Sequence, residues 1–268
     1  MIDIHTLTPE SFALLPLVVE GESKEIRDAG IDAAGQRLCV IKLKPTIYSF
    51  TSNRTGIVPG SGSLRLRATK VLAGVLKQAG IAHAYRDFSE HFILADLVAH
   101  PPNVEVIVKA FHGGTSKHRY YGMSGTAIRS GSNFAGVVIR DEDAYPHMVV
   151  RFDWRNPFQH PETNVKLADE ILPEPVADWF ISVEQARLTA LRSFSVLSNF
   201  LSKRDIIIND LCLFITEDGE QVFGEISQDC GRFRHFDLGS LDKDVWRAGG
   251  SSQQVLEKWK IFADLVEL

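Results

Sequence analysis

The stretch Gly224-Glu-Ile-Ser-Gln-Asp-Cys-Gly-Arg232 gathers acidic residues, an arginine and small residues directly after a predicted strand. The element Leu241-Asp-Lys-Asp-Val-Trp-Arg247 follows nearby and adds further charges. A polar loop at the end of a strand is where enzymes of mixed helix and sheet commonly present their reacting groups. These two segments therefore predict part of a functional site.

A predicted hairpin leads into this loop. Residues 206–214 and 221–226 read as two strands joined by Glu217-Asp-Gly219, which is a strong turn signal. Apolar residues recur at helical spacing over 64–79, 184–203 and 251–268, and this spacing predicts three helices. We expect Gly80 to end the first of these helices and Ser182 to cap the start of the second.

The sequence pattern of the N-terminal half of the chain predicts antiparallel strands. Residues 14–20 and 38–43 read as strands, and 92–98 and 104–108 read as a strand pair joined by a turn at 100–103. Residues 45–63 are rich in Ser, Thr, Gly and Pro and predict a long loop, which in a compact protein is usually functional or mobile.

Two glycine-containing segments carry groups that suit an anion. Gly21-Glu-Ser-Lys24 can form a turn that folds over a phosphate, or an exposed hairpin turn. In His112-Gly-Gly-Thr-Ser-Lys-His-Arg119, two glycines let the backbone approach a ligand and the following side chains supply donors, although a solvated turn is the alternative.

Composition limits the functional classes. The chain has 268 residues, 44% hydrophobic and 24% charged, with a net charge of −5. This balance is typical of a globular protein and does not favour a nucleic-acid partner. The apolar runs are too short to span a bilayer and the first twenty residues lack a secretory pattern, so we expect a cytoplasmic protein with no membrane partner. Cys39, Cys212 and Cys230 fit neither a disulfide framework nor a zinc site, and a structural role is expected for each.

The order of motifs resembles phosphoribosylaminoimidazole-succinocarboxamide synthetase, or SAICAR synthetase, over nearly the whole chain. The resemblance rests on six elements in the family's order, each weak when taken alone. They are Gly21 with Lys24; Ala79-Gly-Ile81; Lys109, Gly114, Thr115 and Arg119; Asp210; Glu225 to Arg232; and Leu241 to Arg247.

The resemblance implies a two-lobe α+β fold, with an antiparallel-sheet lobe containing one helix at 1–108, an α+β lobe at 109–268 and a cleft between them. Family members activate the carboxylate of carboxyaminoimidazole ribonucleotide with ATP and join it to aspartate. That chemistry requires magnesium-binding carboxylates and cationic groups for the phosphates.

The chain departs from the family where magnesium and ATP would bind. Phe214 and Gly224 stand where the family has metal-binding carboxylates, and neither can ligate a hard cation. Glu22 stands where a second lysine is usual and opposes phosphate binding by like-charge repulsion. Gln228 replaces the proline of the family's Ser-Pro-Asp. A shift of one residue would align Asn209 with the family's Asp in place of Asp210, but neither alignment restores the metal pair.

The ribonucleotide side of the predicted site is retained. Asp229 and Asp210 are the candidate catalytic residues, with Asp229 the preferred general acid or base. The resemblance places a substrate-binding role on Ser49, Lys109, Gly114, Thr115, Arg119, Ser227 and Arg232. Lys24 is the candidate nucleotide-phosphate residue, and no metal ligand is assigned.

Several of these residues have a simpler structural interpretation. Asp229 and Arg232 could form an ion pair that ties down the loop, Arg119 could be a surface residue, and Asp210 could pair at a strand end. His112, His118 and His235 lie near the candidate loops, where histidines are more often solvated than catalytic. Arg151-Phe-Asp-Trp-Arg155 has no counterpart in the family and is either part of a substituted site or a surface strand.

Three functions remain open. The first is a SAICAR synthetase-like enzyme that makes or rearranges a C–N bond, or closes a ring, on a phosphoribosyl imidazole or purine-type nucleotide without Mg-ATP. Homologues of this kind accompany nucleoside-antibiotic pathways of the coformycin and pentostatin type. The second is a divergent ATP-dependent SAICAR synthetase with metal ligands such as Glu217, Asp218 or Glu225. The third is a catalytically dead nucleotide-binding homologue. A homo-oligomer is possible in each case.

Overall fold

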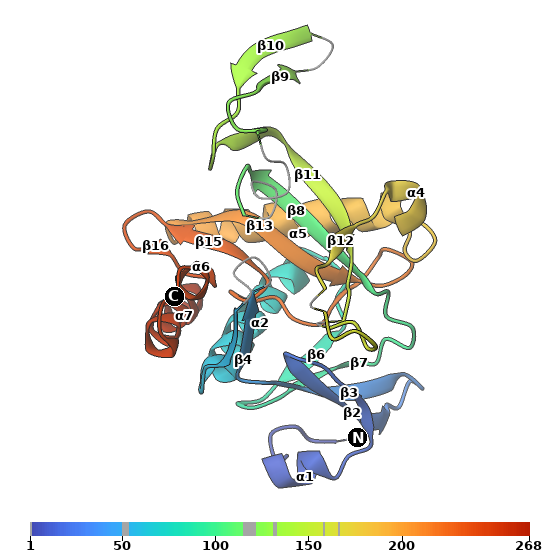
Figure 1. Cartoon of the computed structure of the whole chain (residues 1–268). Helices are drawn as coiled ribbons and strands as arrows, with labels where there is room; N and C mark the ends of the chain where they lie inside the picture. The colour runs from blue at the N-terminus through green and yellow to red at the C-terminus, as the bar shows by residue number, and fades with distance from the viewer. Residues whose placement is uncertain (1, 50–53, 115–121, 131–132, 158, 166) are drawn as a thin grey trace.

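The computed structural model of the chain describes residues 2–49, 54–114, 122–130, 133–157, 159–165 and 167–268. The chain is an α+β protein with a five-stranded sheet formed by early segments and a seven-stranded sheet formed by later ones. Neighbouring strands in both sheets run antiparallel. In Figure 1 the first sheet lies below the second, and helix α2 lies beside them. The predicted α+β class is confirmed.

The first sheet has the strand order β1-β2-β3-β7-β6. Its strands are β1 (Leu17–Glu20), β2 (Lys24–Ile31), β3 (Arg37–Leu43), β7 (Ile93–Asp96) and β6 (Tyr85–Phe88). A short helix, α1 (Pro9–Ala13), begins with a capping box between Thr8 and Ser11. Its Phe12 stacks on Phe92 with ring centroids 4.8 Å apart, so the helix closes the outer face of this sheet with a small apolar cluster.

The second sheet has the order β12-β11-β8-β13-β15-β16, and β14 also pairs with β13. The bounds are β12 (Glu170–Ile171), β11 (Ala144–Trp154), β8 (Val104–Phe111), β13 (Ile206–Ile215), β15 (Gly231–His235), β16 (Gly239–Ser240) and β14 (Val222–Phe223). Two small hairpins complete the strands: β4 (Thr46–Ser49) with β5 (Arg54–Ile57), and β9 (Ala127–Ser130) with β10 (Asn133–Val138). The β9–β10 hairpin projects from the rest of the molecule (Figure 1).

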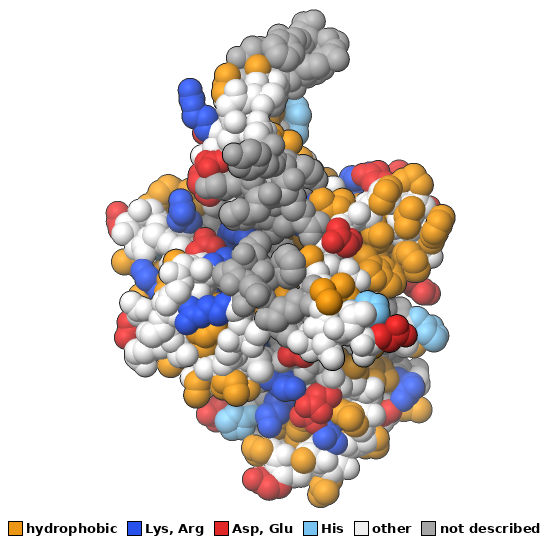
Figure 2. Space-filling model, in the orientation of Figure 1, with side chains coloured by type: hydrophobic (Ala, Val, Ile, Leu, Met, Phe, Trp, Pro, Cys, Tyr) orange, Lys and Arg blue, Asp and Glu red, His pale blue; other side chains and the backbone are white. Residues whose placement is uncertain are grey.

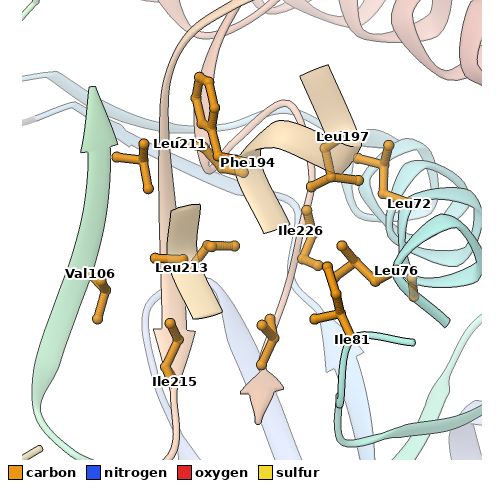
Figure 3. Packing of buried hydrophobic residues seen from close by; sticks show 14 of the residues in the cluster. Leu72, Leu76, Ile81, Val106, Phe194, Leu197, Leu211, Leu213, Ile215 and Ile226 are labelled. Atoms are coloured by element: carbon orange, nitrogen blue, oxygen red, sulfur yellow. The ribbon is translucent and has the colours of Figure 1, made fainter. Parts of the chain in front are cut away.

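The core lies on one face of the second sheet. In β8 and β13 alternate residues point to that face, and they include the buried Val106, Leu211 and Leu213. Helices α5 (Val183–Ser202) and α2 (Ser61–Gln78) cover them with apolar faces that include Phe194 and Leu72 (Figure 3). Each large aliphatic side chain buried in this way contributes roughly 1.5–3 kcal/mol. The opposite face of the same strands is left for the pocket.

The three long helices match the sequence prediction. Ser182 is the N-cap of α5, and Gly80 follows α2 with φ of 68°, a conformation that glycine adopts without strain. Helix α7 (Ser252–Glu267) begins with a capping box between Ser251 and Gln254 and buries Trp259 completely. The short helices α4 (Glu174–Ala177) and α6 (Asp244–Arg247) were not predicted.

Two predictions about strands are wrong. The segments at 92–98 and 104–108 do not pair, because β7 pairs with β3 and β6 while β8 pairs with β11 and β13 in the other sheet. The segment 45–63 is not a continuous loop, since it contains β4, β5 and the start of α2. The turn at residues 100–103 thus carries the chain from one sheet to the other and does not close a hairpin.

On the face of the molecule that Figure 2 shows, apolar side chains form a region over α4. Trp179, Phe180 and Leu188 are exposed in this part of the chain. Among the described residues, no helix combines the length and the apolar character that crossing a membrane requires.

Candidate active site

One face of the second sheet forms the floor of a pocket with a volume of about 880 Å³. Side chains along a strand alternate between its two faces, so β8 and β13 send every second residue to the core and the residues between to the pocket. The floor residues are Glu105, Ile107, Lys109, Arg151, Asp153, Asp210, Cys212 and Phe214. The first sheet and β4–β5 supply the opposite wall, which includes Lys24, Lys44 and Ser49. The pocket therefore lies between the two parts of the chain.

At one end of the floor, Lys109, Asp210 and Arg232 occupy neighbouring positions on three strands. Lys109 Nζ donates a hydrogen bond to Asp210 Oδ2 at 2.7 Å, and Arg232 Nη1 donates to the same oxygen at 2.6 Å. Burial alone would raise the pKa of Asp210, but the two cations outweigh it and lower the pKa to about 2. Arg232 Nε also lies 3.8 Å from Asp244 Oδ1, but Asp244 is paired with Arg247 at 2.6 Å. Lys109 and Arg232 both line the pocket, so they can bind an additional anion there.

Gly114 packs directly against Arg232. A Cβ atom at Gly114 would lie 2.0 Å from Arg232 Cζ, and Gly114 has φ of 59°. Only glycine fits this approach, so the loop after β8 holds the guanidinium in place. Thr115, Arg119 and His118 lie outside the described residues, and the roles predicted for Thr115 and Arg119 stay predictions.

Asp229 lies in a second ion-pair cluster beside this end of the pocket. Its Oδ1 lies 3.2 Å from Lys243 Nζ and its Oδ2 lies 3.8 Å from Arg65 Nη2. Burial opposes ionisation, but Lys243 and Arg65 lower the pKa of Asp229 below its ordinary value. Both candidate catalytic carboxylates are thus held as anions near neutral pH. They are suited to orienting donors or cationic groups, and a role in proton transfer stays a prediction.

Ser227 is fully buried and does not line the pocket. Its hydroxyl donates to Glu225 Oε1 and accepts the Asp229 backbone N–H at 3.1 Å. Glu225 in turn forms a two-bond pair with the fully buried Arg65, with Nε to Oε1 at 2.7 Å and Nη2 to Oε2 at 2.5 Å. The structure therefore gives Ser227 a supporting position beneath the loop, and Glu225 is already engaged by a cation.

The other end of the pocket is organised around Phe214. Lys24 Nζ lies 4.9 Å from the ring centroid and Arg155 Cζ lies 5.0 Å from it, both within cation–π range. A Cβ atom placed on Gly224 would lie 3.2 Å from the Phe214 ring and 3.4 Å from Lys24 Nζ. Burial lowers the pKa of Lys24 from its ordinary value, and Glu225 partly offsets this. An aromatic ring, a glycine and an ammonium group thus meet at this end.

This arrangement does not fit a magnesium ion. Two positions that the family resemblance assigns to metal-binding carboxylates are the non-ligating Phe214 and Gly224, and the Lys24 ammonium lies against both. At 4 Å in a partly buried site, two like unit charges repel each other by about 4 kcal/mol, and a divalent ion roughly doubles this. Glu217 and Asp218, considered as substitute ligands, lie in the β13–β14 turn and do not line the pocket.

Sequence reasoning gave no definite role to the β11 side of the floor. Arg151 forms two hydrogen bonds to Asp153, from Nε to Oδ1 and from Nη2 to Oδ2, each at 2.7 Å. The alternation of charged and aromatic residues in Arg151-Phe-Asp-Trp-Arg155 was the available signal, and it places Arg151 and Asp153 on the pocket face. The surface-strand interpretation is wrong for this pair, since both side chains are about nine-tenths or more buried.

Asp169 also lines the pocket and was not singled out from the sequence. Burial and the neighbouring Glu105 carboxylate raise its pKa to about 6, although the Asn156 backbone N–H donates to Oδ1 at 3.1 Å. A carboxyl group that titrates near neutral pH is suited to proton transfer. No local motif marks Asp169, because its pKa depends on residues brought together only by folding.

The structure gives the cysteines and the described candidate histidines no direct role in the pocket's chemistry. Burial raises the pKa of Cys39 and Cys230 to about 12 and that of Cys212 well above its ordinary value, so the thiols are poor nucleophiles. His112 is fully buried and its Nδ1 lies 3.1 Å from Tyr145 Oη. Neither His112 nor His235 lines the pocket.

Comparison with solved structures gives extensive matches to SAICAR synthetases. The enzyme from Ehrlichia chaffeensis superimposes with a TM-score of 0.73 at 18% identity, over 94% of this chain and 98% of that one. The enzyme from Pyrococcus horikoshii OT3 gives 0.67 at 19% identity, over 94% and 96%. The Saccharomyces cerevisiae SAICAR synthase complexed with SAICAR gives 0.66 at 15% identity, over 99% and 97%.

A curated protein also matches in sequence. It is the bifunctional cordycepin biosynthesis cluster protein 3 of Cordyceps militaris, 29% identical over 287 aligned positions. The match covers 90% of this chain but only 32% of that protein, so the chain spans about a third of its length. No family model matches the sequence. The chain therefore has the SAICAR synthetase fold, with Phe214 and Gly224 at two positions that the motif resemblance assigns to metal-binding carboxylates.

Proposed function

We propose that this protein is a SAICAR synthetase-like enzyme that acts on a phosphoribosyl imidazole or purine-type nucleotide and makes, rearranges or cyclises at a C–N bond without Mg-ATP. The ribonucleotide phosphate binds at the end of the pocket that contains Lys109 and Arg232. These two cations share the Asp210 carboxylate beside the glycine-containing loop after β8. Phosphate is the class of ligand that such a cluster binds by charge-assisted hydrogen bonds.

The observation that carries the ATP-free part of the proposal is the position of Lys24. Its ammonium lies against Phe214 and beside Gly224, where two carboxylates would be needed to hold magnesium. A triphosphate without its metal would also meet the exposed Glu22 in the turn before Lys24. Both features weaken Mg-ATP binding, while neither touches the Lys109 and Arg232 end of the pocket.

The chemistry that remains available is limited. Joining an amine to a free carboxylate needs activation, which ATP supplies in the family this chain resembles. An amine can instead condense with a carbonyl carbon and lose water, or the reverse reaction can open a ring, without ATP. Such steps need proton transfer near neutral pH. Asp169, with a pKa of about 6, is a candidate for this role, whereas Asp229 and Asp210 have lowered pKa values and would orient the reacting groups.

The curated relative supports a pathway context for this proposal. Its printed description places that protein in a cordycepin biosynthesis cluster. We propose that the present chain likewise serves nucleoside-antibiotic biosynthesis, of the coformycin or pentostatin type. Neighbouring genes that resemble a phosphoribosyltransferase and a short-chain dehydrogenase would support this assignment, whereas a purine operon would favour an ATP-dependent ligase.

The direct test is turnover by the purified protein, followed by mass spectrometry. Phosphoribosyl imidazole and purine nucleotides are incubated in EDTA, and in parallel with Mg-ATP and aspartate. Our proposal predicts a changed nucleotide in EDTA. ATP consumption that requires both carboxyaminoimidazole ribonucleotide and aspartate would instead establish a divergent SAICAR synthetase. Nucleotide binding with no conversion, also in a lysate of the producing organism, would favour a catalytically dead homologue.

A further inference from the structure

A buried hydrogen-bond donor on the pocket floor has no partner among the described residues. Arg151 uses Nε and Nη2 to bind Asp153, which leaves Nη1 enclosed and without a hydrogen bond. The Arg151 side chain is only 10% exposed and belongs to the pocket lining. Burying such a donor without a partner is unfavourable, so an unpaired donor in a pocket points to a ligand that accepts its hydrogen bond.

The residues around Arg151 indicate which chemical group of a ligand fits there. Arg151 is opposite Ile107 in the β11–β8 register, and Ile107 is opposite Cys212 in the β8–β13 register. These two side chains form an apolar strip next to the guanidinium. The strip lies two residues along the strands from the Lys109 and Asp210 pair, about 7 Å at the usual strand rise. A flat ring on the strip would therefore present an edge to Arg151 while an attached phosphate reached the cationic end.

Charge decides which acceptor suits this donor. The Asp153 carboxylate holds two of the guanidinium nitrogens and neutralises the charge of Arg151. A neutral pair gains little from a second anion, but it can still donate from Nη1 to a neutral oxygen or nitrogen. The free donor is thus matched to a carbonyl oxygen or ring nitrogen and poorly matched to phosphate.

We propose that Arg151, held in position by Asp153, determines specificity by donating a hydrogen bond to a neutral acceptor on the edge of the substrate's heterocycle, an exocyclic carbonyl oxygen in an imidazole nucleotide. This inference rests on the proposed function, because it places a phosphoribosyl heterocycle in the pocket. A site with a buried donor discriminates strongly against analogues that lack the acceptor.

The test uses two ribonucleotides that differ at this acceptor. They are 5-aminoimidazole ribonucleotide and its 4-carboxamide, each titrated calorimetrically into the full chain in EDTA. We expect wild type to bind the carboxamide on the order of 10- to 100-fold more tightly. Arg151→Lys retains a cation for Asp153 but replaces the three guanidinium nitrogens with a single ammonium nitrogen, so the donor at Nη1 is lost. The preference should therefore fall to near unity while binding of the unsubstituted ribonucleotide changes little.

A second variant tests whether the lost preference comes from a folding defect in Arg151→Lys. Arg151→Met combined with Asp153→Asn removes the whole ion pair and leaves no buried charge without a partner, so it should also lose the preference. Arg67→Met, on α2 outside the pocket lining, is the control and should retain it. No preference in wild type, or a preference that survives both Arg151 variants, would overturn the role of Arg151. If neither ribonucleotide bound wild type, the proposed function would fail and this inference with it.

Discussion

Lys24 Nζ lies 4.9 Å from the centroid of the Phe214 ring and 3.4 Å from the point where a side chain on Gly224 would begin. Three residues from different strands and loops thus fill one end of the pocket with a cation, a ring and a glycine. The same end would hold two carboxylates and a metal ion in a chain that followed the SAICAR synthetase motif. The backbone also differs from what an aspartate would favour at this position, since Gly224 adopts φ of 85°.

This backbone conformation predicts that a side chain at Gly224 destabilises the protein. We expect Gly224→Ala to lower the free energy of unfolding by about 1–2 kcal/mol, because an L-residue at positive φ is strained and its Cβ would contact the Phe214 ring. Gly74→Ala is the matched control, since nothing lies within 4 Å of a Cβ there in helix α2. It should stabilise the protein by roughly 0.5–1 kcal/mol in urea denaturation. Equal effects of the two changes would contradict the assignment.

The Arg65 and Glu225 pair predicts a larger stability effect. Both side chains are almost completely buried, and Arg65 Nη1 also donates to the Lys44 backbone oxygen at 2.9 Å. Arg65→Met should lower the free energy of unfolding by about 3–5 kcal/mol because it leaves the Glu225 charge buried without its partner. Arg67→Met, on the same helix, removes partly exposed ion pairs and should cost about 1 kcal/mol or less. Similar losses in both variants would argue against a structural role specific to Arg65.

The fold was largely predictable because the local patterns were clear. Apolar spacing located α2, α5 and α7, and the turn at Glu217-Asp-Gly219 located the β13–β14 hairpin. The strand pairing failed at β7 and β8, since a turn signal cannot show that two successive strands enter different sheets. The 11-residue strand β11 was missed apart from Arg151 to Arg155, because its earlier part is mostly exposed and has no regular alternation of burial.

The site was predictable only in part. The order of motifs identified five residues that the structure places in the pocket lining: Lys24, Lys109, Asp210, Asp229 and Arg232. Ser227 follows the same motif but is buried beneath the loop. Arg151, Asp153 and Asp169 form part of the same lining through sheet register and loop packing, which a single sequence does not specify.

The raised pKa of Asp169 predicts a pH-dependent gain in stability when the carboxyl is removed. Its folded-state pKa of about 6 exceeds the ordinary 3.8, so its stabilising contribution is present at low pH and is lost as the pH rises through 6. Asp169→Asn should therefore be more stable than wild type by about 1–2 kcal/mol above pH 7, and the difference should shrink towards pH 4. The exposed Glu162→Gln serves as control in thermal melts across this range. A constant difference at all pH values would refute the shift.

We expect Arg232 to contribute to the affinity for a phosphorylated ligand. Arg232→Ala should weaken binding of an imidazole ribonucleotide by about 1.5–3 kcal/mol, because a charge-assisted hydrogen bond is lost. Lys109 still neutralises Asp210 in this variant, so the protein should remain folded. Arg86→Ala, which removes an exposed side chain outside the pocket, is the control. Unchanged affinity in Arg232→Ala would remove Arg232 from the site.

The central claim is that the pocket binds a ribonucleotide without Mg-ATP, and calorimetry of the purified wild-type chain tests it most directly. Imidazole ribonucleotides are titrated in EDTA and in magnesium, and ATP is titrated under the same two conditions. Our account predicts ribonucleotide binding that is equal with and without magnesium, and no ATP binding at micromolar affinity in either condition. Magnesium-dependent binding of ATP at micromolar affinity or better would contradict it.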